Sequence, residues 1–92
     1  MKNIELKIDI LMLELGFEKI KVNNVLNYFF NGSYYKVNYF DELKSYVIES
    51  ASNYTEAVNN VYEDSDIYPI SLDEKKILEE LRKDLIKYYI TD

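Results

Sequence analysis

The sequence predicts a single α+β domain in which a three-stranded antiparallel meander is covered on one face by helices. One observation is the pair Asn31-Gly32, which lies between two runs rich in aromatic and β-branched residues, as in a hairpin turn. Another is the helical spacing of apolar residues near both ends of the chain. A chain of 92 residues can bury one modest core. We therefore expect residues 1–92 to form one domain with the order αβββαα.

Residues 4–15, at the start of the chain, fit two periods. Apolar and charged residues alternate from Ile4 to Ile10, which is a strand period, and a helical stripe runs through the same segment. The stripe consists of Ile4, Ile8, Leu11, Met12 and Leu15. We favour a helix, because Leu and Met suit one and Gly16 followed by Phe17 is typical of a helix end. Residues 17–22 then form either a short edge strand or a connector.

The Asn31-Gly32 turn sets the register of the predicted meander. A two-residue turn pairs Phe30 with Ser33, and the outward pairing continues with Phe29 opposite Tyr34. Because side chains alternate along a strand, one face is predicted to line the core. Its residues are Leu26, Tyr28, Tyr35, Val37 and Tyr39. A break at Asp41-Glu42 precedes the third strand, residues 44–51.

Two helices are expected after the meander. Asn53 with Glu56 has the spacing of a capping box and opens a short helix, and Ser71 with Glu74 opens a long one that ends near Ile90. The apolar stripe of the long helix comprises Ile77, Leu78, Leu81, Leu85, Tyr88 and Tyr89. Between the two helices, residues 63–70 are expected to form an acidic loop, since Pro69 disfavours helix at the preceding residue.

The composition argues against an enzyme. The chain has no histidine and no cysteine, which removes the commonest general base and the thiol nucleophile. Its two glycines, Gly16 and Gly32, stand apart, so no phosphate-binding loop can be written and we expect no cofactor. Carboxylates of Glu63, Asp64 and Asp66 could bind a hard cation. The segment lacks the spacing of a calcium loop, and a solvated acidic loop is the favoured interpretation.

The charge is concentrated in the middle of the chain. Of 17 acids and 11 bases, residues 41–74 hold nine acids and one base, a net of −8, whereas each flank carries five bases and four acids, a net of +1. Such a field repels nucleic acid and attracts basic proteins, and it also promotes solubility. The chain has no apolar run long enough for a bilayer and no signal-peptide pattern, so we expect no membrane association and a cytoplasmic location.

The acids fall at predicted turns and helix ends, where side chains are exposed. We take this acidic segment, with the tyrosine inside it, as the candidate partner-binding surface. The candidate residues are Asp41, Glu42, Glu56, Glu63, Asp64, Asp66, Tyr68, Asp73 and Glu74. The simpler alternative is that Asp73 and Glu74 complement a helix dipole and the other acids hydrate a loop. Phe29 and Tyr34, on the outer strand face, form a second candidate surface, covered by the first helix or by a partner.

An acidic domain of this size and element order resembles two groups of small bacterial and phage inhibitors. Residues 46–51 and 56–69 resemble the short α+β immunity proteins of toxin systems. The element order and the placing of carboxylates are similar to those of anti-CRISPR proteins that imitate DNA. The resemblance implies a non-enzymatic inhibitor that blocks the basic site of a nuclease-type partner, in a bacterium or a phage-infected cell. The alternative is an interaction module that self-associates through the aromatic strand face or a sheet edge, as a homodimer.

Overall fold

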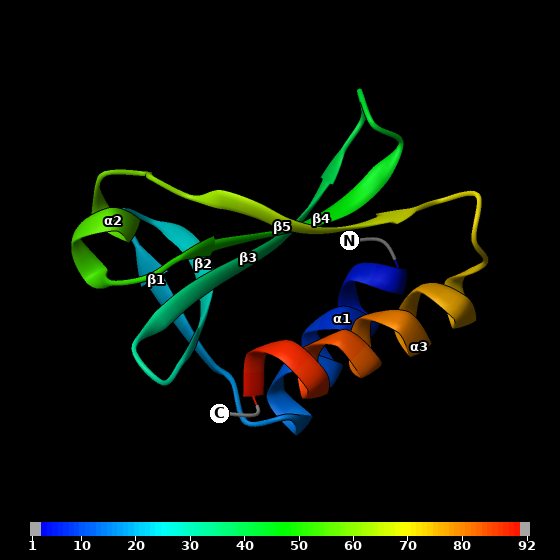
Figure 1. Cartoon of the computed structure of the whole chain (residues 1–92), viewed down its shortest axis with the longest axis horizontal. Coiled ribbons are helices and arrows are strands. Elements are labelled where there is room, and N and C mark those ends of the chain that lie inside the picture. Colours follow the sequence, from blue (N-terminus) through cyan, green and yellow to red (C-terminus); the bar gives the residue numbers. More distant parts are fainter. Residues whose placement is uncertain (1–2, 91–92) are drawn as a thin grey trace.

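The computed structural model describes residues 3–90, which form an α+β fold with a five-stranded antiparallel sheet (Figure 1). The elements are α1 (Asn3–Glu14), β1 (Glu18–Val22), β2 (Val25–Phe30), β3 (Ser33–Phe40), β4 (Ser45–Ala51), α2 (Tyr54–Val58), β5 (Glu63–Pro69), α3 (Glu74–Asp84) and the π-helical segment η1 (Leu85–Ile90). The strands lie side by side in chain order. The α+β class is confirmed, and the predicted meander is the centre of a larger sheet that gains β1 and β5.

The helix predicted over residues 4–15 is confirmed as α1, including its end. The amide of Gly16 donates to Leu13 O and that of Phe17 to Met12 O, each at 3.1 Å, which is the bonding pattern of a Schellman motif. Gly16 has φ +99°, the left-handed conformation that this motif requires. Phe17 is thereby turned back into the core, where its exposed fraction is 2%.

The central hairpin has the predicted turn and register. Asn31 and Gly32 have φ angles of +49° and +86°. A type I′ turn requires a positive φ at both of its central residues. Phe30 pairs with Ser33, Phe29 with Tyr34, and Tyr28 with Tyr35. A second two-residue turn, Asn23-Asn24, also has positive φ at both positions and joins β1 to β2.

The prediction that residues 63–70 form a loop is wrong, because β5 pairs with β4 along most of its length. The pairs run from Ser45–Pro69 to Ser50–Glu63, with a bulge between Ile48 and Glu49. β5 is an edge strand, and Tyr68 is its only buried residue. Charged residues and proline are the features that natural sheets place on edges to prevent further pairing. The acids are therefore compatible with this strand.

Two details of the helix ends differ from prediction. The side chain of Asp73, not Ser71, caps α3 by accepting from Lys76 N at 2.8 Å. Beyond Asp84 the helix widens into η1, whose π-type winding adds a residue to each hydrogen-bonded turn. This winding brings Tyr89 onto the core and leaves Tyr88 63% exposed.

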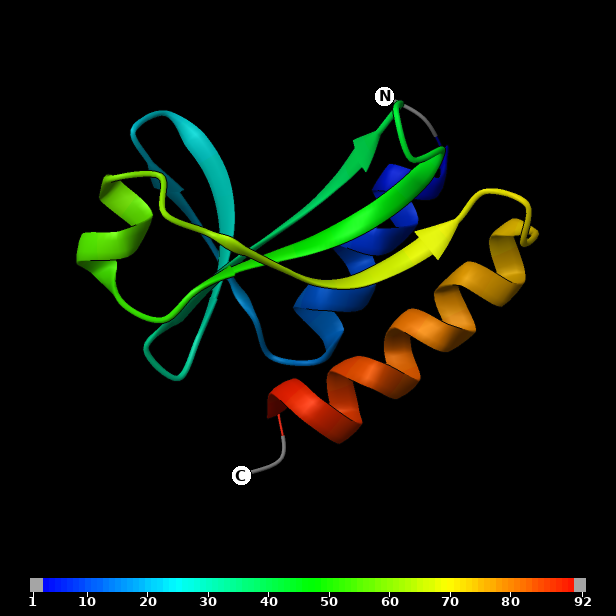
Figure 2. The same ribbon diagram turned by 45° about the horizontal axis from the view of Figure 1, so that its top comes forward.

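The helices lie on both faces of the sheet, which corrects the prediction of a single covered face. Figures 1 and 2 show α1 and α3 side by side along one face, with α2 at one end of the other. The main core lies under α1, α3 and η1, and Met12, Ile48, Leu81 and Leu85 are fully buried there. On the opposite face α2 places Ala57 against Tyr34, Val22 and Ala51. Of the predicted core face, Tyr28 and Tyr35 are buried, whereas Leu26 is 41% exposed.

Candidate partner-binding site

Most of the candidate acids already have partners within the domain. Asp41 pairs with Lys44, Glu56 accepts from the amide of Ser52, Asp66 accepts from the hydroxyl of Tyr89, Asp73 caps α3, and Glu74 pairs with Lys7. These contacts tie down turns and helix ends. For Asp73 and Glu74 they agree with the simpler alternative, in which first-turn acids stabilise the helix start.

Three of the candidate acids have no such contact. The side chains of Glu42, Glu63 and Asp64 are exposed, and none makes a hydrogen bond or an ion pair with residues 3–90. Glu42 lies in the turn between β3 and β4, whereas Glu63 and Asp64 open β5 at the other end of the sheet. Seven residues of strand span about 20 Å. The free carboxylates therefore form two groups at opposite ends of the β5 edge.

Glu49, a residue that sequence reasoning did not select, joins the group at the start of β5. The register of β4 and β5 pairs it with Asp64 beside the bulge, so two acidic residues are direct partners on neighbouring strands. Like charges in this position destabilise a sheet. Glu49 accepts a hydrogen bond from Asn38 Nδ2 at 3.0 Å and makes no ion pair with residues 3–90. We call Glu49, Glu63 and Asp64 the acidic edge.

The base best placed to neutralise the acidic edge is engaged elsewhere. Lys36 is the partner of Glu49 across β3 and β4, on the side away from Asp64. Its Nζ lies 4.0 Å from the centroid of the Tyr62 ring and 3.4 Å from Asn60 Oδ1. Burial and nearby Glu49 raise the pKa of Tyr62, against the lowering effect of its bond to Asn27. Within the acidic edge Glu63 and Asp64 are exposed and Glu49 is half-buried, and Lys36 neutralises none of the three by an ion pair.

Tyr68, predicted to contact a partner, is instead part of the core. Its exposed fraction is 4%, and its hydroxyl donates to Asp84 Oδ2 at 2.7 Å. Burial is the main cause of the raised pKa of Tyr68, and the hydrogen bond to Asp84 raises it further. The side chain points inward because alternation along β5 places Tyr68 and Asp66 on the face covered by α3 and η1.

The second candidate surface is largely covered. The ring centroids of Phe29 and Tyr34 lie 5.0 Å apart. Tyr34 is only 8% exposed, because it is in one apolar cluster with Ala57 and Val58 of α2 and with Tyr62. The helix that covers this surface is α2, which corrects the predicted alternative of the first helix. The prediction places all helices on the opposite face of the sheet, and therefore it does not include α2 as the cover of Phe29 and Tyr34.

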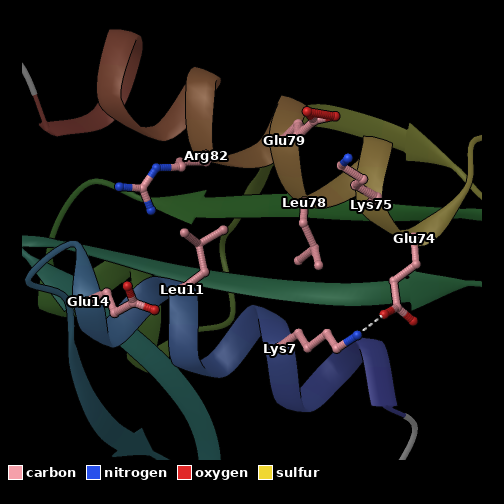
Figure 3. Close-up of a pocket in the computed structure, with 8 residues that line it drawn as sticks. All are labelled: Lys7, Leu11, Glu14, Glu74, Lys75, Leu78, Glu79 and Arg82. Atoms are coloured by element: carbon pink, nitrogen blue, oxygen red, sulfur yellow. Dashed lines mark hydrogen bonds and ion pairs between the residues drawn. The ribbon is translucent and has the colours of Figure 1, made fainter.

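A hollow lies between α1 and α3, on the face of the sheet that these two helices cover. It encloses about 400 Å³, with Leu11 and Leu78 at its centre and charged side chains around it (Figure 3). Lys7 and Glu14 lie toward opposite ends of its α1 side, and Lys7 reaches across to Glu74 (Figure 3). Within residues 3–90 no group of three or more acids is arranged to hold a metal ion. No helix among these residues is long and apolar enough to cross a membrane.

Comparisons with protein-family models, with curated proteins and with solved structures find no match to this chain.

Proposed function

We propose that this protein is a non-enzymatic inhibitor that binds a basic surface of a partner protein through its acidic edge. The observation that supports this function most directly is the pairing of Glu49 with Asp64. In the free protein the two carboxylates repel each other. An Arg or Lys side chain placed between them would replace this repulsion with two charge-assisted contacts. The arrangement is unfavourable for the fold and favourable for binding a cation.

The chemistry of the site favours a partner that normally binds phosphates. Closely spaced carboxylates present negative charge and hydrogen-bond acceptors, as a nucleic-acid backbone does, and they need no covalent chemistry to block such a site. Glu42 extends the negative surface to the far end of β5, about 20 Å away, which matches roughly six base-pair steps of a DNA strand. A nuclease-type partner fits this surface, and both the toxin-immunity and the anti-CRISPR roles belong to this class. Either role places the protein in the cytoplasm of a bacterium or a phage-infected cell.

The proposal can be tested with a panel of bacterial toxin nucleases and guide-loaded CRISPR nucleases. We expect the wild-type protein to block DNA or RNA cleavage by one of them. The double variant Glu63→Lys with Asp64→Lys should abolish the block, because it reverses the acidic edge without touching an internal contact. Glu49 is left unchanged in this variant, since its bond to Asn38 contributes to the sheet.

A matched control separates position from total charge. The double variant Glu18→Lys with Glu79→Lys changes the net charge by the same amount at two exposed acids outside the acidic edge. It should inhibit as well as the wild-type protein. Equal loss of inhibition in both double variants would mean that only total charge matters, and unchanged inhibition in the Glu63 and Asp64 variant would refute the acidic edge as the binding surface.

A further inference from the structure

Helix α1 carries two apolar stripes, and only one of them faces the core. Ile8, Leu11 and Met12 are buried beneath the helix. A second set of apolar side chains lies on the opposite side and is about half exposed: Leu6 at 48%, Ile10 at 48% and Leu13 at 44%. A surface helix normally has one apolar stripe and a polar opposite side. The second stripe is unusual because nothing in residues 3–90 buries it.

The spacing of the second stripe is that of a helix–helix seam. Leu6, Ile10 and Leu13 are separated by four and then three residues, which is the pattern of the core positions in a coiled coil. Lys7 and Glu14 follow Leu6 and Leu13 directly and are seven residues apart, so they flank the seam on the same side. That side faces the hollow between α1 and α3, where Figure 3 shows both residues.

The flanking charges are complementary to those of a second copy of the same helix. If two α1 helices pack antiparallel about a two-fold axis near Ile10, Lys7 of each copy lies opposite Glu14 of the other. Such a pairing forms two equivalent ion pairs. Glu14 makes no hydrogen bond or ion pair within residues 3–90, and Lys7 contacts only Glu74 at its exposed end. Both side chains are exposed, and in a dimer Lys7 would exchange its partner Glu74 for Glu14 of the other copy.

Three half-exposed side chains are a small interface, and on one side the stripe is bordered by the charged residues Lys7 and Glu14. There it adjoins the hollow of about 400 Å³ whose centre is Leu11 and Leu78. A standard interface buries about 800 Å² of surface on each partner. The stripe and the walls of this hollow together provide more contact area than the stripe of α1 alone. The second copy can use both, since its own α1 would lie along the same side.

We propose that the exposed stripe of α1 is a homodimer interface in which two α1 helices pack antiparallel, with Lys7 of each copy opposite Glu14 of the other. The dimer uses α1 in place of the aromatic strand face, which α2 covers. This inference is independent of the acidic edge, because none of the residues of that edge lies on α1. Failure of one proposal leaves the other standing.

Sedimentation velocity from micromolar to millimolar protein tests the dimer. We expect wild-type protein to shift from monomer to dimer with concentration, and Ile10→Lys to raise the dissociation constant by about tenfold or more. Ile70→Lys is the matched control, because Ile70 has the same 48% exposure in the turn after β5 and should dimerise as the wild type does. A monomeric wild type throughout, or equal behaviour of the two variants, would overturn the proposal.

A charge exchange tests the antiparallel pairing. Lys7→Glu and Glu14→Lys should each weaken self-association, since each places like charges opposite one another in the dimer. Mixing the two variants should restore association as a heterodimer, because every flanking pair then has opposite signs. Thermal melts of the single variants verify that each is folded. If two folded variants associate no better when mixed than alone, the antiparallel arrangement is wrong.

Discussion

The hydroxyl of Tyr68 on edge strand β5 donates a 2.7 Å hydrogen bond to the carboxylate of Asp84 at the end of α3. Two similar pairs connect helices to strands elsewhere in the domain. Tyr28 of β2 donates to Asp9 of α1 at 2.8 Å, and Tyr89 of η1 donates to Asp66 of β5 at 2.6 Å. Several of the ten tyrosines therefore serve to hold the helices on the sheet.

The Tyr68–Asp84 pair should contribute measurably to stability. Tyr68→Phe removes the hydroxyl and leaves a partly buried carboxylate without its donor, so we expect a loss of about 1–3 kcal/mol in the free energy of unfolding. Urea denaturation at neutral pH measures the change. Tyr88→Phe is the control, because Tyr88 is 63% exposed and should change stability by less than about 0.5 kcal/mol. Equal free energies of unfolding for the two variants would mean that the buried hydrogen bond does not contribute to stability.

The same tyrosines should make the fold sensitive to alkali. Burial, with the adjoining carboxylates, raises the pKa of Tyr28, Tyr68 and Tyr89 above the ordinary value of 10.0. Because the folded-state pKa values are raised, the stability that these groups provide is complete below pH 10. It is lost as the pH rises from 10 toward the folded-state values, by up to about 1.4 kcal/mol per pH unit for each tyrosine.

Urea denaturation between pH 8 and pH 11 tests the alkaline effect, and Tyr28→Phe should reduce the pH slope above pH 10 by about one proton. The variant will be less stable at neutral pH but should lose less of its remaining stability in alkali. A slope identical to that of the wild type would show that Tyr28 titrates alike in the folded and unfolded states.

The β2–β3 turn offers a test of backbone conformation alone. Gly32 has φ +86°, and no atom lies within 4 Å of the position where a Cβ would stand. Gly32→Val should therefore destabilise the domain by about 1–3 kcal/mol through backbone strain without any steric clash. Asn31→Gly should cost less than about 0.5 kcal/mol, because glycine adopts the same positive φ freely. Thermal denaturation of both variants is the measurement, and an unchanged melting temperature for Gly32→Val would contradict the strain.

The elements that could be predicted from the sequence are those with strong local signals. The central hairpin follows from Asn31-Gly32, and the end of α1 follows from Gly16 and Phe17. β5 could not be predicted, since it is fixed by backbone pairing with β4 and buries only Tyr68. An acidic stretch with proline has low strand propensity, and only its edge position makes it acceptable.

The prediction of the candidate site contains errors for the same reason, because it does not include strand β5. With residues 63–70 taken as a loop, Tyr68 and Asp66 were expected at the surface, and Glu49 had no reason to be linked to Asp64. Once β5 is paired, alternation turns Tyr68 and Asp66 inward and brings Glu49 opposite Asp64. The signal available in the sequence was the single apolar pair Ile67-Tyr68 after the acids, which is short for a strand.

The apolar stripe that runs from α3 into η1 predicts large losses of stability on substitution. Leu81 and Leu85 are 1% and 0% exposed in the main core, so Leu81→Ala and Leu85→Ala should each cost about 2–5 kcal/mol. Ile70→Ala is a suitable comparison, because Ile70 is 48% exposed and loses few contacts. Denaturation in urea gives all three values. A cost below about 1 kcal/mol at Leu81 would be inconsistent with its burial.

Salt dependence should distinguish the inhibitor surface from the dimer surface in one set of measurements. If the acidic edge binds a basic site, the association rate with the partner nuclease should fall by about tenfold or more between 0.05 and 0.5 M salt, because mobile ions screen long-range attraction. The double variant Glu63→Lys with Asp64→Lys should bind slowly at every salt concentration.

Dimerisation through Leu6, Ile10 and Leu13 depends mainly on apolar burial and should change little over the same range. Stopped-flow binding measures the first effect and sedimentation velocity the second. A partner association rate that does not respond to salt would exclude an electrostatic role for the acidic edge, even if inhibition itself were observed.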